Sequence, residues 1–268
     1  MTDLEAKEAI IEVGRRMYLK GFVASNDGNI SIKTGPNEIW CTPTGVSKGY
    51  MNQNMLVKVD LDGKVICGEN TPSSEIKMHF RVYKENPEVM AVTHAHPPAA
   101  TSFAIAGFEL DRAILPEAVV NLGTVPIAPY ASPGTQEVPD SIAQYCRTYN
   151  AVLLANHGAL SWGRDVFEAY YRLESLEYYA TVMMYTYGIL GKANELSYGQ
   201  VSELIKTRQK LGINSGGIPK YASEETNLGG FSSPESYYSQ KSYWDREKEE
   251  IIQDIAERVT QNIMKSKK

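Results

Sequence analysis

The sequence predicts one domain of the α/β or α+β class, followed by a C-terminal extension. Amphipathic helical patterns and short β-like runs are mixed along the chain and follow no regular βαβ repeat. After residue 211 the chain becomes rich in Gly, Ser, Tyr and Asn and shows little periodicity. The 268 residues, 43% of them hydrophobic, supply enough apolar material for one sizeable core. We therefore expect a domain over residues 1–211 and an extension over residues 212–268.

The helices are predicted from apolar residues at helical spacing and from their start signals. Thr2 and Glu5 match a capping box in front of the first apolar stripe, which Gly21 ends. Thr71 and Pro72 are expected to start a second helix, because proline is favoured at the first helical position. Further helical patterns cover residues 141–149, 164–187 and 197–210.

The strands are predicted from short apolar runs that lie between Asn, Asp, Gly and Pro residues. They cover residues 30–33, 39–42, 56–59, 89–94, 151–155 and 159–162. Residues 212–243 are rich in Gly, Ser, Tyr and Asn, and their aromatic residues argue against a plain solvated linker. A charged final helix is expected from Asp245 to Met264.

Composition excludes several classes of protein. The 27 Lys and Arg residues against 32 Asp and Glu residues give a net charge of −5, so no basic surplus indicates nucleic acid or an acidic membrane as partner. No apolar run approaches the length of a membrane span, and the N-terminus lacks a signal-peptide pattern. Cys41, Cys67 and Cys146 form no CxxC pair, which argues against a disulfide framework or a thiolate zinc site. We expect a cytoplasmic protein.

Three of the four histidines lie at the ends of predicted strands. His94 and His96 are two residues apart in a strand, so their side chains point the same way and can share a metal ion. His157 ends another apolar strand. Three neutral imidazoles that converge in this way form a catalytic zinc site with an open position. The alternative is that the histidines only cap a strand and a turn, which is the commoner case for an isolated His-x-His pair.

Glu75 and its neighbours suggest a second polar site. A carboxylate in the first turn of a helix is favoured by the helix dipole, so Glu75 could be a simple capping charge. The hydroxyls of Ser73 and Ser74 and the free N–H groups of the same helix start could also hold a phosphate. The polar glycine turns at residues 26–29 and 42–45 could complete such a cradle, although each alone indicates only a turn.

Taken together, five motifs resemble the class II aldolase/adducin family, and most closely its L-fuculose-1-phosphate aldolase branch. They are Asn-Asp-Gly-Asn at 26–29, Thr-Pro-Thr-Gly at 42–45, Pro-Ser-Ser-Glu at 72–75, His-Ala-His at 94–96 and Asn-His-Gly at 156–158. Their order and spacing agree over roughly residues 5–210. The resemblance implies a three-layer sandwich with a mostly antiparallel sheet between helices. It also implies a homotetramer with sites at subunit interfaces.

The resemblance assigns roles to individual residues. It implies that the metal ligands are His94, His96 and His157 and that the ion is Zn²⁺, although Mn²⁺ and Co²⁺ also suit such ligands. It implies that Glu75 is the acid/base that moves a proton at the substrate's C3 and can also ligate the metal. The residues implied to hold the substrate phosphate are Asn29, Thr44, Gly45, Ser73 and Ser74.

The implied function is a metal-dependent aldolase that cleaves a ketose 1-phosphate to dihydroxyacetone phosphate and an aldehyde. Two residues depart from the family pattern: Leu115 replaces a tyrosine that acts on the C4 oxygen, and Pro133 replaces an aromatic residue. Glu117 or the tail tyrosines Tyr237, Tyr238 and Tyr243 could supply the missing proton donor. Alternatively, the substrate differs at C4 and beyond, as a 5-deoxy or 5-methylthio pentulose 1-phosphate would, and we favour this second explanation slightly.

Other functions remain as alternatives. L-ribulose-5-phosphate 4-epimerase and methylthioribulose-1-phosphate dehydratase share the expected fold, and an adducin-like interaction module would keep the fold without the chemistry. A Schiff-base aldolase would need a buried lysine, and Lys33, Lys48 and Lys77 are interpreted as surface residues. His79 is interpreted as a packing or surface histidine. The extension could be a lid or an interface-packing segment.

Overall fold

The structure is a computed structural model, and it describes residues 1–222. Eight strands form one sheet in the order β4-β3-β2-β1-β5-β8-β7-β6. Every neighbouring pair is antiparallel except β6 and β7, which are parallel. The strands are β1 (Asn29–Gly35), β2 (Glu38–Cys41), β3 (Val57–Val59), β4 (Val65–Cys67), β5 (Ala91–Ala95), β6 (Ile127–Ala128), β7 (Ala151–Leu154) and β8 (Gly158–Gly163).

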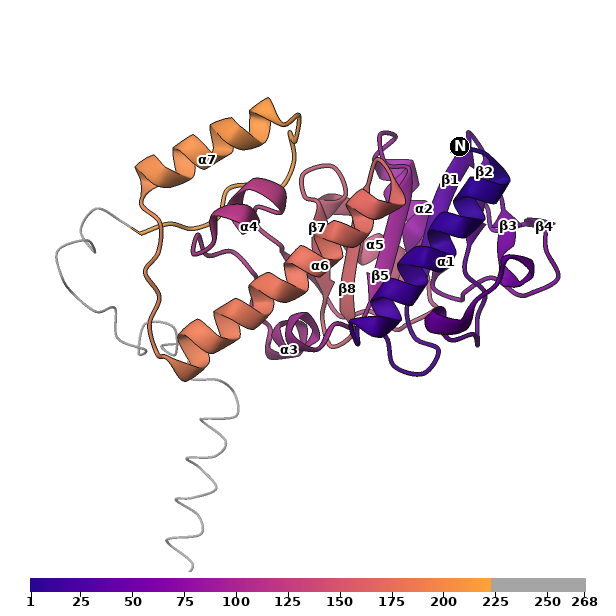
Figure 1. Cartoon of the computed structure of the whole chain (residues 1–268), viewed down its shortest axis with the longest axis horizontal. Helices are drawn as coiled ribbons and strands as arrows, with labels where there is room; N and C mark the ends of the chain where they lie inside the picture. Colours follow the sequence, from indigo (N-terminus) through magenta and orange to yellow (C-terminus); the bar gives the residue numbers. More distant parts are fainter. Residues whose placement is uncertain (223–268) are drawn as a thin grey trace, which may run out of the picture.

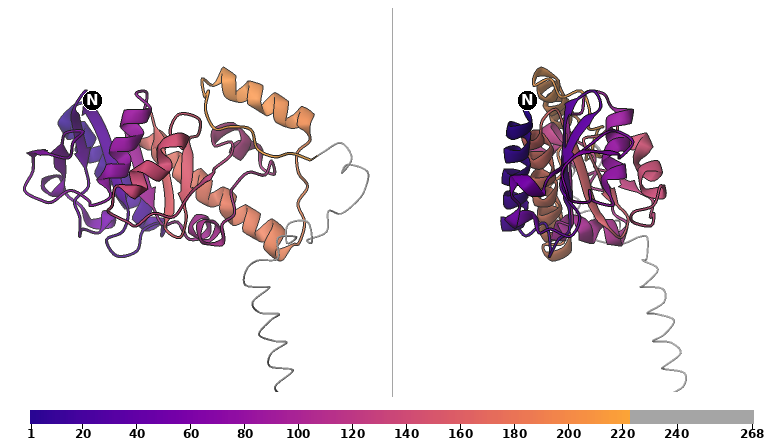
Figure 2. Two further views of the ribbon diagram at one scale, coloured as in Figure 1. Left: turned by 180° about the vertical axis from the view of Figure 1, so that it is seen from behind. Right: turned by 90° about the vertical axis from the view of Figure 1, so that its right-hand side faces the viewer.

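Helices cover both faces of this sheet (Figures 1 and 2). They are α1 (Asp3–Leu19), α2 (Ile76–Glu85), α3 (Pro98–Ala106), α4 (Pro116–Asn121), α5 (Glu137–Ile142), α6 (Val166–Met183) and α7 (Tyr198–Lys210). One core cluster lies between the sheet and α1, α3 and α6, and a second lies between the sheet, α2 and α5. The predicted fold class, with a mostly antiparallel sheet between two helical layers, is confirmed.

The first helix forms as its sequence predicts. Thr2 accepts a hydrogen bond from the N3 amide of Glu5, and the Glu5 carboxylate accepts one from the Thr2 amide. The apolar stripe of α1 is fully buried against the sheet at Ile10, Val13 and Met17. Local capping and amphipathicity therefore suffice to place this helix.

The second helix begins later than predicted, at Ile76 instead of Pro72. The preceding residues pair with the turn at 42–45: the Thr44 amide donates to the Thr71 carbonyl, and the Ser73 amide donates to the Thr42 carbonyl. These tertiary hydrogen bonds hold residues 71–74 out of the helix. Glu75 therefore occupies the N-cap position and not the first turn.

Two other helical stretches and four short elements differ from the expectation. The helical segment expected at 141–149 begins at Glu137 and ends in a 3₁₀ turn at Ala143–Tyr145. The helical pattern expected to reach residue 187 leaves α-geometry after Met183 and continues as a π-helix, Met184–Ile189. The sequence does not predict β4, β6, α3 and α4, because β4, β6 and α4 offer too few residues for a periodic signal and the apolar residues of α3 show no helical periodicity.

The described part of the expected extension packs on the domain. Residues 212–222 run beside residues 111–124: the Thr124 amide donates to the Gly216 carbonyl, and the Lys220 amide donates to the Asp111 carbonyl. The predicted final helix and Tyr237, Tyr238 and Tyr243 lie outside the described residues. Within residues 1–222, no helix has the length and apolar character needed to cross a bilayer.

Candidate metal centre

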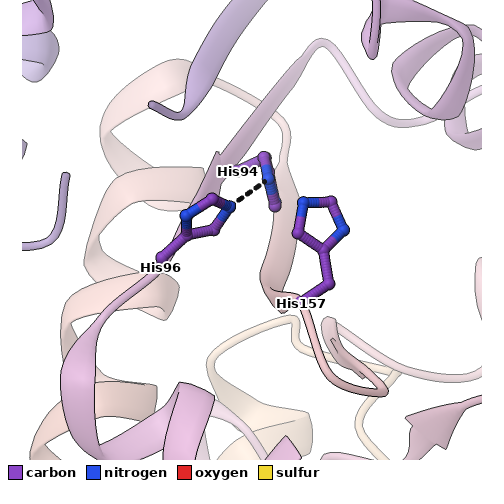
Figure 3. Close-up of side chains that lie close together, drawn as sticks. All are labelled: His94, His96 and His157. Carbon is purple, nitrogen blue, oxygen red and sulfur yellow. Dashed lines mark hydrogen bonds between the residues drawn. The ribbon is translucent and has the colours of Figure 1, made fainter. Parts of the chain in front are cut away.

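Three histidine rings meet at one end of the sheet (Figure 3). His94 is the fourth residue of β5, His96 follows that strand, and His157 lies in the turn between β7 and β8. One ring nitrogen from each histidine lies within 4.8 Å of the others. The antiparallel pairing of β5 with β8, which sets His94 opposite Leu160, brings the distant His157 turn to the end of β5.

The donor set fits a divalent metal ion. The Nδ1–H of His94 donates to the Ala159 carbonyl at 3.0 Å, and this leaves its Nε2 as the free lone pair. The Nε2 atoms of His94 and His96 lie 3.2 Å apart. Two nitrogens that bind one tetrahedral zinc ion at about 2.0–2.1 Å lie about 3.3 Å apart, so the spacing matches. The Nδ1 of His96 faces the Asp27 carboxylate at 3.4 Å, which orients the second ring.

Burial keeps the imidazoles of His94 and His96 neutral. His94 is fully buried, and the loss of solvent lowers its pKa to about 3. The pKa of His96 is also lowered, first by burial and then by the neighbouring His157 ring. Neutral imidazole is the form that binds a metal ion, so the site is prepared for a ligand role at neutral pH.

The Glu75 carboxylate lies against the rings. Its Oε1 is 3.1 Å from Nε2 of His157, and its Oε2 is 3.6 Å from Nε2 of His94. Asn29 donates from Nδ2 to the same Oε2 at 3.0 Å. Burial raises the pKa of Glu75, but the hydrogen bond that it accepts from His157 and the neighbouring histidine rings outweigh burial, so the pKa of this carboxyl lies below its usual range. Glu75 is therefore ionised and able to accept a proton at neutral pH.

Strand register explains the contact between Asn29 and Glu75. Asn29 pairs with His94 across β1 and β5, so its side chain reaches the histidine end of the sheet. The preceding Gly28 has φ +74°, and a Cβ atom there would lie 2.8 Å from the His94 carbonyl oxygen. Only glycine fits this close approach, which carries Asp27 to the side of His96.

The other residues predicted to bind phosphate form a separate pair of turns. Residues 42–45 lie against residues 72–75 through a bridge between Pro43 and Pro72 and the backbone bonds described above. The Ser73 hydroxyl accepts a hydrogen bond from the Glu75 amide. Among the described residues, the amides of Gly45 and Ser74 have no hydrogen-bond acceptor. The structure thus brings Thr44, Gly45, Ser73 and Ser74 together, whereas Asn29 bonds to Glu75.

Sequence reasoning misplaced Lys48, which is buried and not on the surface. Only 1% of its surface is exposed, and its Nζ donates to the carbonyls of Asn26 and Val46 at 2.7 and 2.6 Å. Burial first lowers its pKa, to about 8, against the attraction of Asp27 and Glu75. A side chain of this length could be assigned to the interior only once its neighbours were known.

The remaining lysines and the fourth histidine lie outside the ring cluster. Lys33 is half-buried and Lys77 is exposed. His79 is fully buried behind Glu75, where its Nδ1 lies 2.8 Å from the Ser31 hydroxyl, which in turn lies 2.7 Å from the Tyr83 hydroxyl. His79 is thus a packing histidine within a buried polar chain.

The departures from the family pattern lie elsewhere. Leu115 is the N-cap of α4, and together with Glu117 it lines a cavity that also includes Lys20, Glu174 and Tyr178. Within residues 1–222, Glu117 forms no hydrogen bond or ion pair with the three histidine rings. Pro133 precedes the turn at Gly134, whose carbonyl accepts a hydrogen bond from Lys77 at 3.4 Å.

Comparison with known proteins finds relatives of one family along most of the described chain. Residues 8–184 match the family model of the class II aldolase and adducin N-terminal domain. A 3-oxo-tetronate 4-phosphate decarboxylase of Haemophilus influenzae is 33% identical over 181 residues, which cover 66% of this chain and 86% of that protein. An L-fuculose phosphate aldolase of Methanococcus maripaludis is 32% identical over 167 residues, which cover 62% of this chain and 89% of that protein.

Two solved structures show the same architecture. An L-fuculose 1-phosphate aldolase superposes with a TM-score of 0.71 at 27% identity, covering 76% of this chain and 96% of that one. YgbL of Escherichia coli superposes with a TM-score of 0.71 at 28% identity, and the match covers 75% of this chain and 98% of that one.

Proposed function

Because the chain belongs to the class II aldolase and adducin family, we propose that it is a metal-dependent lyase that acts on a phosphorylated sugar. The observation that carries this proposal is the grouping of three imidazole nitrogens within 4.8 Å, with the Glu75 carboxylate against two of the rings. His94, His96 and His157 would hold the ion, for which zinc is the first choice and manganese or cobalt the alternatives. A homotetramer with sites at subunit interfaces stays part of the proposal and is tested by light scattering.

The reaction we propose is aldol cleavage of a ketose 1-phosphate. When the C3–C4 bond breaks, its electron pair stays on C3, while the C4 hydroxyl loses its proton and becomes the carbonyl of an aldehyde. A divalent ion held by His94, His96 and His157 would supply a Lewis acid, which would stabilise the negative charge of the enediolate. The ionised Glu75 lies beside the histidine rings. It takes up a proton and returns it to C3, which gives dihydroxyacetone phosphate.

A second candidate is decarboxylation of a 3-oxo acid phosphate, as the name of the Haemophilus relative suggests. Loss of carbon dioxide from C1 of such a substrate leaves an electron pair on C2, next to the C3 carbonyl. The resulting enediolate is the one that aldol cleavage also forms, and its protonation again gives dihydroxyacetone phosphate. The scissile carboxylate is already ionised, so this reaction needs no base in place of the tyrosine that Leu115 replaces.

A product assay separates the candidates. The zinc-loaded protein is incubated with L-fuculose 1-phosphate, 5-deoxy and 5-methylthio pentulose 1-phosphates, and 3-oxo-tetronate 4-phosphate. Triose phosphate with an aldehyde supports the aldolase, and triose phosphate with carbon dioxide supports the decarboxylase. Epimerisation or loss of water would assign the chain to the other reactions of this fold. Failure to turn over any substrate, in protein shown to hold zinc, would favour an adducin-like module.

The role of Glu75 has its own test. Glu75→Gln should keep one equivalent of zinc but exchange the C3 proton of dihydroxyacetone phosphate with deuterium at least about 100-fold more slowly, the usual scale of general acid–base catalysis. Glu203→Gln, which changes an exposed carboxylate on α7, is the matched control and should exchange at the wild-type rate. Rapid exchange by Glu75→Gln would remove Glu75 from its role.

A further inference from the structure

The buried ammonium of Lys48 has no obvious purpose in packing. Its three donors meet two backbone carbonyls, and within residues 1–222 no carboxylate forms an ion pair with it. Lys58, the other buried lysine of the described chain, is bound differently: its Nζ forms ion pairs with Asp3, at 3.1 Å, and with Glu38. An ammonium buried without an ion-pair partner is costly, and the more distant charges of Asp27 and Glu75 offset only part of that cost for Lys48.

Lys48 joins the two turns that surround the candidate site. The Asn26 carbonyl belongs to the turn that brings Asp27 to His96. The Val46 carbonyl follows Thr44 and Gly45, in the turn that lies against residues 72–75. One side chain therefore fixes the separation of two loops that are otherwise connected through the β1–β2 hairpin.

The paired turns at 42–45 and 72–75 need a positive charge nearby if they are to hold phosphate. The five residues predicted to bind phosphate are all uncharged, and Glu75 beside them is ionised. Lys48 is electrostatically coupled to both Asp27 and Glu75, which places its charge within range of this end of the sheet. The Lys48 ammonium is itself buried, so water screens its charge less than it would screen the charge of an exposed lysine.

We propose that Lys48 is the cationic component of the phosphate site: it holds the 26–29 and 42–45 turns together and supplies the positive potential that attracts the substrate's phosphate. The ligand class is a phosphate monoester dianion. This inference rests on the proposed function, which supplies a phosphorylated substrate, and it adds a positioning residue that none of the five motifs contains.

The test compares two substitutions of Lys48 in the zinc-loaded, full-length protein, with inorganic phosphate as the probe. Lys48→Gln retains amide N–H donors for the carbonyls but removes the charge, and Lys48→Met removes both. We expect phosphate to bind at least tenfold more weakly to each variant in calorimetric titration, with KM raised in parallel and kcat changed much less. Lys58→Met, which removes the other buried ammonium, is the matched control and should bind phosphate as the wild type does.

Three results would overturn the inference. Wild-type phosphate affinity in Lys48→Gln would show that the charge does not act on phosphate. An equal loss of affinity in Lys58→Met would show a general effect on the fold. Borohydride trapping of a substrate adduct on Lys48 would make it a nucleophile. Phosphate could also bind directly to the zinc ion. The titrations are therefore repeated with His94→Ala variants, in which the ion is lost. Lys48-dependent phosphate binding without lyase turnover would refute the proposed function and leave this inference standing.

Discussion

His79 provides the sharpest link between this structure and a measurement. The ring is fully buried, and burial lowers its pKa from the usual 6.5 to about 3, although the negative charge of Glu75 acts in the opposite direction. Its Nδ1 atom contacts the hydroxyl of Ser31, and protonation of the ring would place a charge in a site without solvent. The folded protein therefore resists protonation of His79, whereas the unfolded chain does not.

The sign and the magnitude of the change in unfolding free energy with pH follow from this difference in pKa. Because the folded pKa lies below the unfolded one, the unfolded state binds more protons between these values. The stabilisation is complete above about pH 6.5 and is lost progressively as the pH falls toward about 3, at about 1.4 kcal/mol per pH unit. Between pH 7 and pH 5, His79 alone should lower the free energy of unfolding by about 2 kcal/mol.

Urea unfolding of the chelated, metal-free protein at pH 7 and pH 5 measures this loss. His79→Asn is the comparison, because its amide can still bond to Ser31 but does not titrate. The wild type should lose about 2 kcal/mol more than the variant between the two pH values, since His94 contributes equally to both. Equal losses in the two proteins would refute the assignment of His79 as a buried neutral ring.

Three further substitutions test the site and its support. His94→Ala should retain less than one equivalent of zinc after dialysis, because two imidazoles hold the ion poorly; full retention would exclude His94 as a ligand. Gly158→Ala would place a Cβ atom 2.6 Å from Cδ2 of His96, so zinc affinity by chelator competition should fall at least about tenfold; unchanged affinity would contradict the geometry. Ser31→Ala removes the hydroxyl shared by Tyr83 and a buried imidazole and should cost about 2–5 kcal/mol in urea unfolding, whereas a loss below about 1 kcal/mol would show that the network is not needed.

The sequence by itself determined the elements whose signals are local. The capping box at Thr2, the apolar stripe behind it and the period-2 spacing of His94 and His96 depend on residues a few positions apart. The fold class followed from the mixture of these patterns together with the five motifs. Such features could be predicted because hydrogen bonds and side-chain directions within one element do not depend on the rest of the chain.

Tertiary structure alone decided where residues distant in sequence meet. The start of α2 moved to Ile76 because residues 71–74 bond to a turn that lies about thirty positions earlier in the sequence. Lys48 became a buried cation because the carbonyls of Asn26 and Val46 surround its ammonium, and Asn29 reached Glu75 through the pairing of β1 with β5. Burial and electrostatic environment are properties of what packs around a side chain, and no local pattern encodes them.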